Sequence, residues 1–131
     1  MRGLLGLALS AWAVTAAAEC LFYERDVTLA GVVNYRAFTV GNKPQSAAIL
    51  ALESPICARA ERQGDPGSNA PQDNIRLVQL VLLPSISPPL PDSKIAVTGT
   101  LFGADAERHR TRVLLYVKAI LGTDKPPQAS R

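Results

Sequence analysis

Hydrophobic and polar residues alternate along most of this chain in short runs that turn-forming residues separate. Alternation with a period of two is typical of half-buried β-strands, whereas amphipathic helices repeat every three to four residues. Five segments carry this pattern, and they predict strands at 26–34, 47–53, 75–83, 94–102 and 112–120. Both faces of the third strand are largely apolar, so we expect it to be central and covered on both sides. The sequence therefore predicts an all-β domain.

Glycines mark two of the predicted strands. Gly31 lies within the first and Gly99 within the fourth, and a glycine inside a strand indicates a sharp bend or the close approach of another backbone. Bending of this kind lets a short sheet close on itself and removes its exposed edges. We therefore expect a small five-stranded OB-like barrel. The link 84–93 contains four prolines, so it has room for at most a turn of helix.

The N-terminal segment 1–18 differs in character from the rest. Arg2 precedes an apolar run from Leu4 to Val14, and alanines occupy positions 16 to 18. This order is typical of a cleaved signal peptide, and the run is shorter than the roughly 20 residues that cross a membrane. We expect a barrel at 19–121, a flexible tail at 122–131, little or no helix outside the signal peptide and no transmembrane segment in the mature chain. The protein is then periplasmic or secreted.

The chain has two cysteines, Cys20 and Cys57, and both follow the signal peptide. An even cysteine count in an exported protein indicates a disulfide, and antiparallel pairing of the first two strands would bring both cysteines to one end of the hairpin. Two other interpretations stay open. Cys20 could be lipidated, although Glu19 stands where a lipoprotein signal has a small residue. Either cysteine could be a catalytic or metal-binding thiol, although neither lies in a cluster with ligand spacing.

The charge balance says little about partners. The formal net charge is +3, from 14 basic and 11 acidic residues. Domains built around polyanion binding usually show a larger basic excess or a basic stripe. Export further reduces contact with nucleic acid. The charge balance and export together argue against nucleic acid as the partner.

Four patches of the sequence carry a resemblance to a known family. They are CLFYERDVTLAGVV at 20–33, SPICARA at 54–60, IRLVQLVL at 75–82 and IAVTGTLFGADAERHRTRVLLYV at 95–117. In these patches the chain resembles a set of small secreted bacterial domains of unknown function with an OB-like fold. The resemblance implies the fold and export to the cell envelope, and it implies no chemistry. Family members often carry two or three neighbouring histidines in the turn where this chain has only His109, so no metal site is expected.

Two links are the candidate contact surface. In an OB barrel, the link between strands one and two and the link between strands four and five flank the binding face; here these are 35–46 and 105–112. Arginines in such links can pair with carboxylates or phosphates of a partner. The residues that we expect to bind are Tyr35, Arg36, Arg108, His109 and Arg110. No set of residues assembles a reaction centre, so we expect a non-enzymatic binding domain with no catalytic residue, metal or cofactor, whose partner is an envelope protein or another extracytoplasmic ligand.

Two alternative functions remain at this point. Tyr35 and Phe38, with Arg36 and Lys43 nearby, could stack and pair with an anionic polymer, either single-stranded nucleic acid or an acidic glycan. The competing expectation is that Phe22, Phe102 and Tyr116 pack the core while Tyr35 and Phe38 cover its mouth. A hydrolase using Glu107 or His109 is the third hypothesis, and the sequence suggests no substrate for it. The oligomeric state is not predicted.

Overall fold

The computed structural model of the protein describes residues 19–61 and 69–124. Within these ranges the chain forms strands and turns and contains no helix. The six strands are β1 (Glu19–Phe22), β2 (Asp26–Val40), β3 (Lys43–Arg59), β4 (Gln72–Val81), β5 (Lys94–Gly103) and β6 (Val113–Asp124). The expected all-β class is confirmed. The expected signal peptide at 1–18 and the residues 125–131 lie outside the described ranges.

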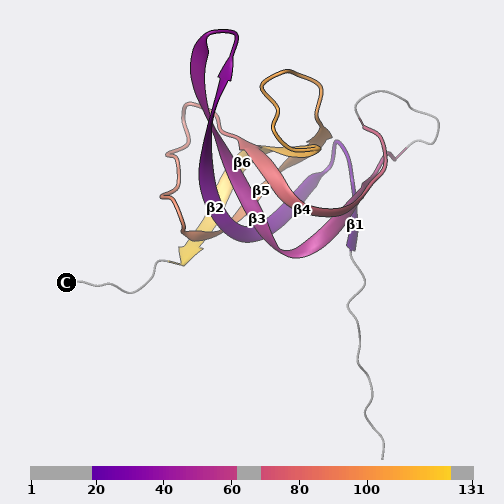
Figure 1. Cartoon of the computed structure of the whole chain (residues 1–131). Coiled ribbons are helices and arrows are strands. Elements are labelled where there is room, and N and C mark those ends of the chain that lie inside the picture. Colours follow the sequence, from indigo (N-terminus) through magenta and orange to yellow (C-terminus); the bar gives the residue numbers. More distant parts are fainter. Residues whose placement is uncertain (1–18, 62–68, 125–131) are drawn as a thin grey trace, which may run out of the picture.

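Five of the strands close into a barrel (Figure 1). The strands follow one another in the order β3, β2, β5, β6 and β4, and β4 pairs with β3 to complete the circle. Four of these pairings are antiparallel, and the β4–β6 pairing is parallel. This Greek-key arrangement confirms the expected OB-like barrel. The sixth strand, β1, was not expected. It pairs in parallel with β3 at residues 56–59, beyond the part of β3 that pairs with β2.

Alternate side chains of the strands fill the barrel interior. Buried residues include Leu29 and Val33 of β2, Leu50 of β3, and Val97 and Leu101 of β5. The strand β4 is central, as expected, because it pairs with both β3 and β6. The expectation that both of its faces are covered is wrong near its start, where Arg76 and Leu77 are exposed. The exposed residues lie beside an irregularity in the β3–β4 pairing, where β3 bulges between Ala51 and Ile56.

The two glycines sit where neighbouring backbone leaves no room for a side chain. A Cβ atom added to Gly31 would lie 2.1 Å from the carbonyl oxygen of Ala51, and one added to Gly99 would lie 2.0 Å from that of Tyr116. The β5–β6 register also shifts between Thr98 and Gly99. Close backbone approach, one of the two reasons predicted for these glycines, is therefore present at both positions.

The disulfide joins Cys20 to Cys57, as expected, and closes a sequence separation of 37 residues. The strands that bring the cysteines together differ from the expected antiparallel hairpin. Each cysteine lies within a strand, and the two are direct register partners in the parallel β1–β3 pair, with Cα atoms 4.3 Å apart. The bond therefore fastens the additional strand β1 to the barrel wall.

The expected long link at 35–46 is wrong. β2 and β3 continue through this segment as paired strands, and a two-residue turn at Gly41 and Asn42 joins Val40 to Lys43. Gly41 has a positive φ of 61°, which glycine adopts without strain. The hairpin extends beyond the barrel as an arm (dark purple in Figure 1). We call residues 36–46 the hairpin arm.

The remaining links follow the expected outline. The segment 84–93 forms turns, and Asp92 N–H donates to the Val33 carbonyl at 2.7 Å, which holds the segment against β2. The strand β6 continues to Asp124, so residues 122–124, assigned to the tail by sequence, pair with β5. Across 19–61 and 69–124, no helix is long and apolar enough to cross a membrane.

Candidate binding site

The loop between β5 and β6 lies next to the hairpin arm above the barrel (Figure 1). The N–H group of Ala104 donates to the carbonyl of Arg112 at 3.0 Å, which closes the base of this loop. Inside the loop, His109 N–H donates to the carbonyl of Ala106 at 3.0 Å. We call residues 104–112 the β5–β6 loop; it includes the expected contact link 105–112.

The side chain of His109 holds the β5–β6 loop in shape. Its Nδ1 atom accepts backbone N–H bonds from Asp105 at 3.0 Å and from Ala106 at 3.1 Å. The imidazole packs edge-on against the Phe102 ring, and only 6% of the side chain is exposed. An acceptor at Nδ1 requires that this nitrogen carry no proton, so the ring is neutral with its hydrogen on Nε2. His109 therefore organises the loop from inside instead of presenting its ring to solvent.

Burial lowers the pKa of His109, because a charged imidazolium loses its hydration in this position. Two neighbouring charges act in opposite directions: the Asp105 carboxylate, 3.4 Å from Nδ1, raises the pKa, and Arg108 lowers it. Desolvation is the largest of these causes. The neutral form is therefore the one that this loop favours.

Gln79 of β4 fastens the loop to the barrel wall. Its side-chain oxygen accepts the backbone N–H of Arg110 at 2.5 Å, and its Nε2 donates to the carbonyl of Arg108 at 3.4 Å. Its own backbone N–H donates to the hydroxyl of Thr111 at 2.9 Å, and that hydroxyl donates to the Val113 carbonyl at 2.7 Å. Gln79 is 7% exposed, and buried polar groups of this kind are costly unless they are bonded. The loop is thus anchored at three of its residues, Arg108, Arg110 and Thr111.

Arg110 connects the loop to the hairpin arm. Its guanidinium carbon lies 4.3 Å above the centre of the Phe38 ring, and its Nη2 donates to the Glu107 carbonyl. A guanidinium over an aromatic face is an attractive cation–π contact. Arg36 lies two positions before Phe38, so both side chains emerge on the same face of β2. The two links selected from the sequence therefore form one surface.

A pocket lies below this contact, between β4 and the β5–β6 loop. It has a volume of about 290 Å³. Its lining residues are Asn74, Arg76, Leu77, Arg110, Thr111 and Arg112. We call it the arginine pocket. None of these lining residues, all within the described part of the chain, carries a carboxylate.

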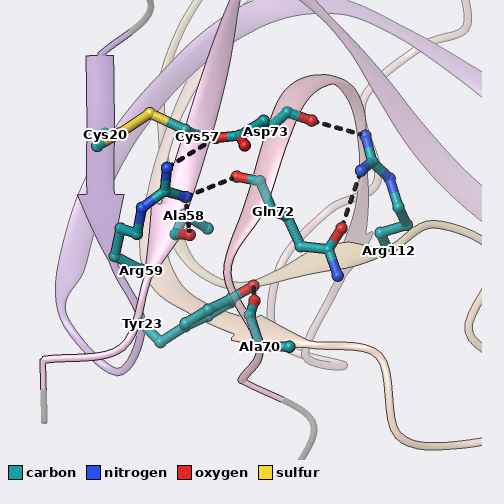
Figure 2. Close-up of polar contacts among 9 residues, drawn as sticks. All are labelled: Cys20, Tyr23, Cys57, Ala58, Arg59, Ala70, Gln72, Asp73 and Arg112. Atoms are coloured by element: carbon teal, nitrogen blue, oxygen red, sulfur yellow. Dashed lines mark hydrogen bonds and ion pairs between the residues drawn. A yellow bond between two sulfur atoms is a disulfide. The ribbon is translucent and has the colours of Figure 1, made fainter. Parts of the chain in front are cut away.

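Arg112 forms one wall of the arginine pocket. Figure 2 shows its guanidinium bound to Gln72 and Asp73 at the start of β4. Its guanidinium donates to the side-chain oxygen of Gln72 at 2.8 Å and to the carbonyls of Asp73 and Asn74 at 3.1 and 3.2 Å. On the other side of β4, Arg59 donates to the Gln72 carbonyl at 3.2 Å and pairs with the Asp73 carboxylate at 2.8 Å. The start of β4 is therefore held between two arginines, one from β3 and one from the β5–β6 loop.

The structure separates the five residues that the sequence selected for binding. Arg36 and Arg108 are exposed, and within the described chain no hydrogen bond or ion pair holds either guanidinium. Arg110 joins the arm to the pocket. His109 is enclosed by its own loop. Tyr35 lies apart from them, because its hydroxyl donates to the Pro89 carbonyl at 2.6 Å in the segment 84–93. Burial there raises the pKa of Tyr35.

Sequence reasoning missed Gln79 as the anchor of the loop and Arg76 as a pocket wall. It named Phe38 only as a ring that stacks or covers the barrel mouth, and it included Arg112 only as the last residue of the link 105–112. The contact of Phe38 with Arg110 and the place of Arg112 in the pocket wall were not predicted. For Gln79 a signal existed, since it is the polar residue on an otherwise apolar strand face. The aromatic assignment needs correction too. Phe22 and Tyr116 are 45% and 49% exposed, and the buried aromatic residue is Tyr23.

A hydrolase that uses His109 as a base would need a nucleophile within hydrogen-bonding reach of the imidazole. The Thr111 hydroxyl bonds to Gln79 and Val113 and not to His109. Nδ1 of His109 is occupied by the two backbone N–H groups of its own loop. Among residues 19–61 and 69–124, no three His, Cys, Asp or Glu side chains come together as a metal site would require.

Comparison with known proteins gives no family for this chain. No family model matches the sequence, no curated protein matches it, and no solved structure matches the fold.

Proposed function

We propose that this protein is an exported, non-enzymatic binding domain that contacts an envelope protein or another extracytoplasmic ligand through the hairpin arm and the β5–β6 loop. The observation that carries the proposal is the contact between Arg110 and Phe38, which joins the two segments into one surface. Anchoring by His109 and Gln79 gives that surface a defined shape before any partner arrives. A preformed surface loses less conformational entropy on binding.

Two features support export. The segment 1–18 has the order of a signal peptide, and disulfides such as Cys20–Cys57 persist in oxidising compartments outside the cytoplasm. Fractionation of cells producing the full chain, with intact-mass measurement of the product, tests this part. We expect periplasmic or secreted material that begins near Glu19. Cytoplasmic material that retains Met1 would contradict the proposal.

The contact surface is tested by site-specific photo-crosslinking in envelope extract. A photo-reactive residue replaces Arg36 or Arg108, whose side chains make no hydrogen bond or ion pair to a described residue. The control position is Lys94, which lies at the opposite end of β5 from the β5–β6 loop. We expect one shared crosslinked partner from the first two positions and not from Lys94, and Arg110→Glu should reduce its yield. The same products from all three positions, or none from Arg36 and Arg108, would refute the proposed surface.

A second candidate is a binder of an anionic polymer, and the three guanidinium groups of the arginine pocket favour it. Such binding releases counterions, so the logarithm of affinity falls linearly with the logarithm of salt concentration. Titrations against single-stranded oligonucleotides and an acidic glycan at several salt concentrations measure this slope. A steep slope with either polymer would favour this candidate over a protein partner.

A further inference from the structure

We infer that the arginine pocket binds an acidic side chain of a partner protein, with an adjacent apolar residue of that partner packing on Leu77. This inference rests on the proposed function and names the chemistry that its surface recognises. The predicted ligand is therefore a short peptide segment in which aspartate or glutamate stands next to an apolar residue.

The pocket carries an excess of positive charge, which favours binding of an anion. The guanidinium of Arg112 contacts three neutral oxygens, and that of Arg110 contacts an aromatic ring and a carbonyl. Arg76 has no hydrogen bond or ion pair to any described residue. Three positive charges thus line one pocket without a carboxylate among its described walls. A carboxylate entering it would accept charge-assisted hydrogen bonds, which are about twice as strong as neutral ones.

Two of the three arginines are positioned in advance. The carbonyls and side chain at the start of β4 hold Arg112, and the Phe38 ring supports Arg110. Arg76 is exposed on β4, and no hydrogen bond or ion pair to a described residue holds its side chain. Ordering one long side chain on binding loses less conformational entropy than ordering three. The arrangement therefore favours binding of a single carboxylate.

The size and surroundings of the pocket favour a peptide over a polymer. Its volume of about 290 Å³ is at the lower end of small-molecule pockets, which suits one side chain. Leu77 on its wall is 37% exposed and offers an apolar contact. A single-stranded polymer would need open aromatic rings for stacking. No described lining residue of the pocket is aromatic, and the neighbouring Phe38 ring lies under Arg110.

The test uses short synthetic peptides and the protein with its Cys20–Cys57 disulfide formed. The probe is a labelled peptide containing alternating leucine and glutamate, and the matched peptide replaces each glutamate by glutamine. Binding is measured by fluorescence anisotropy for the natural chain, for Arg76→Gln and for Lys94→Gln. Lys94→Gln removes the same charge at the other end of β5, outside the pocket lining. Circular dichroism and melting curves confirm that both variants are folded.

We expect the acidic peptide to bind and the amide peptide to bind at least about tenfold more weakly, as for a lost charged hydrogen bond. Arg76→Gln should weaken acidic-peptide binding by a similar factor, whereas Lys94→Gln should leave it within about twofold. Equal losses in both variants, equal binding of the two peptides, or no binding of the acidic peptide would overturn the inference. So would tight oligonucleotide binding that requires Arg76. A partner crosslinked at Arg36 and Arg108 together with a failed peptide test would refute this inference alone and leave the proposed surface standing.

Discussion

The guanidinium of Arg110 rests 4.3 Å above the Phe38 ring and thereby joins two segments that lie far apart in the sequence. An exposed cation–π contact contributes about 0.5–1 kcal/mol. A double-mutant cycle with Phe38→Leu and Arg110→Met, followed by urea unfolding, should give a coupling free energy in that range. The same cycle with Phe38→Leu and Lys118→Met serves as the control and should be additive within about 0.3–0.5 kcal/mol. Additivity in both cycles would mean that the contact contributes nothing.

The second prediction concerns the protonation of His109. Because burial lowers its pKa, an NMR titration of the imidazole should give a midpoint below the usual value of about 6.5. His109 is the only histidine in the chain, so its signal needs no further assignment. Asp105→Asn should lower the midpoint further, because the carboxylate that favours the charged ring is removed. A midpoint at or above the usual value would contradict the described hydrogen bonds at Nδ1.

The same group makes stability depend on pH. A histidine whose pKa is lower in the folded state than in the unfolded state takes up its proton more readily when unfolded. Its stabilising contribution is therefore present above about pH 6.5 and is lost as the pH falls toward the lowered folded-state pKa. Urea unfolding at pH 7.5 and pH 5 should show this loss in the natural chain and a smaller one in His109→Gln. An equal loss in both chains would assign the effect to other groups.

The disulfide gives the fourth prediction. Cys20–Cys57 closes a separation of 37 residues, for which the chain-entropy model gives a stabilisation of about 4 kcal/mol. The double variant Cys20→Ala, Cys57→Ala should lose much of that free energy of unfolding, and a reductant should lower the melting temperature of the natural chain but not of the variant. A natural chain whose melting temperature ignores the reductant would contradict the described bond.

The fifth prediction compares three glycines. Gly31→Ala and Gly99→Ala each place a Cβ atom within 2.1 Å of a backbone oxygen, so strands must separate. We expect each to cost about 3 kcal/mol or more, or to prevent folding. Gly122→Ala is the matched control, since a Cβ there meets nothing within 4 Å, and it should change stability by less than about 0.5 kcal/mol. Equal effects at all three positions would contradict the close backbone approach.

The barrel strands could be predicted because their side chains alternate between a filled interior and the outside. That signal fails where neither face is buried. In the hairpin arm most residues are exposed, so no alternation marks it, although the Gly41–Asn42 pair is a recognised two-residue turn signal. The strand β1 has four residues and is too short to show a period. Its place beside β3 depends on pairing that local sequence does not encode.

The arginine pocket depends on contacts that sequence spacing cannot reveal. Arg76 and Arg112 face the same pocket because parallel β4 and β6 lie side by side. His109 was selected as a contact residue because its position is in a polar turn. Its actual role follows from two backbone N–H groups that point at Nδ1, and backbone direction in a loop is set by the closed barrel.

The parallel β4–β6 pairing also affects how the chain folds. The pairings β2–β5 and β4–β6 join strands that are not neighbours along the chain, with Asp26 opposite Thr100 and Gln79 opposite Leu114. Such non-local pairings slow folding to about milliseconds or seconds. The arginine pocket draws its walls from β4 and from the loop that leads into β6, so a nascent or half-folded chain lacks this pocket. Under the binding that we propose for the pocket, only molecules that have completed ring closure can capture the ligand.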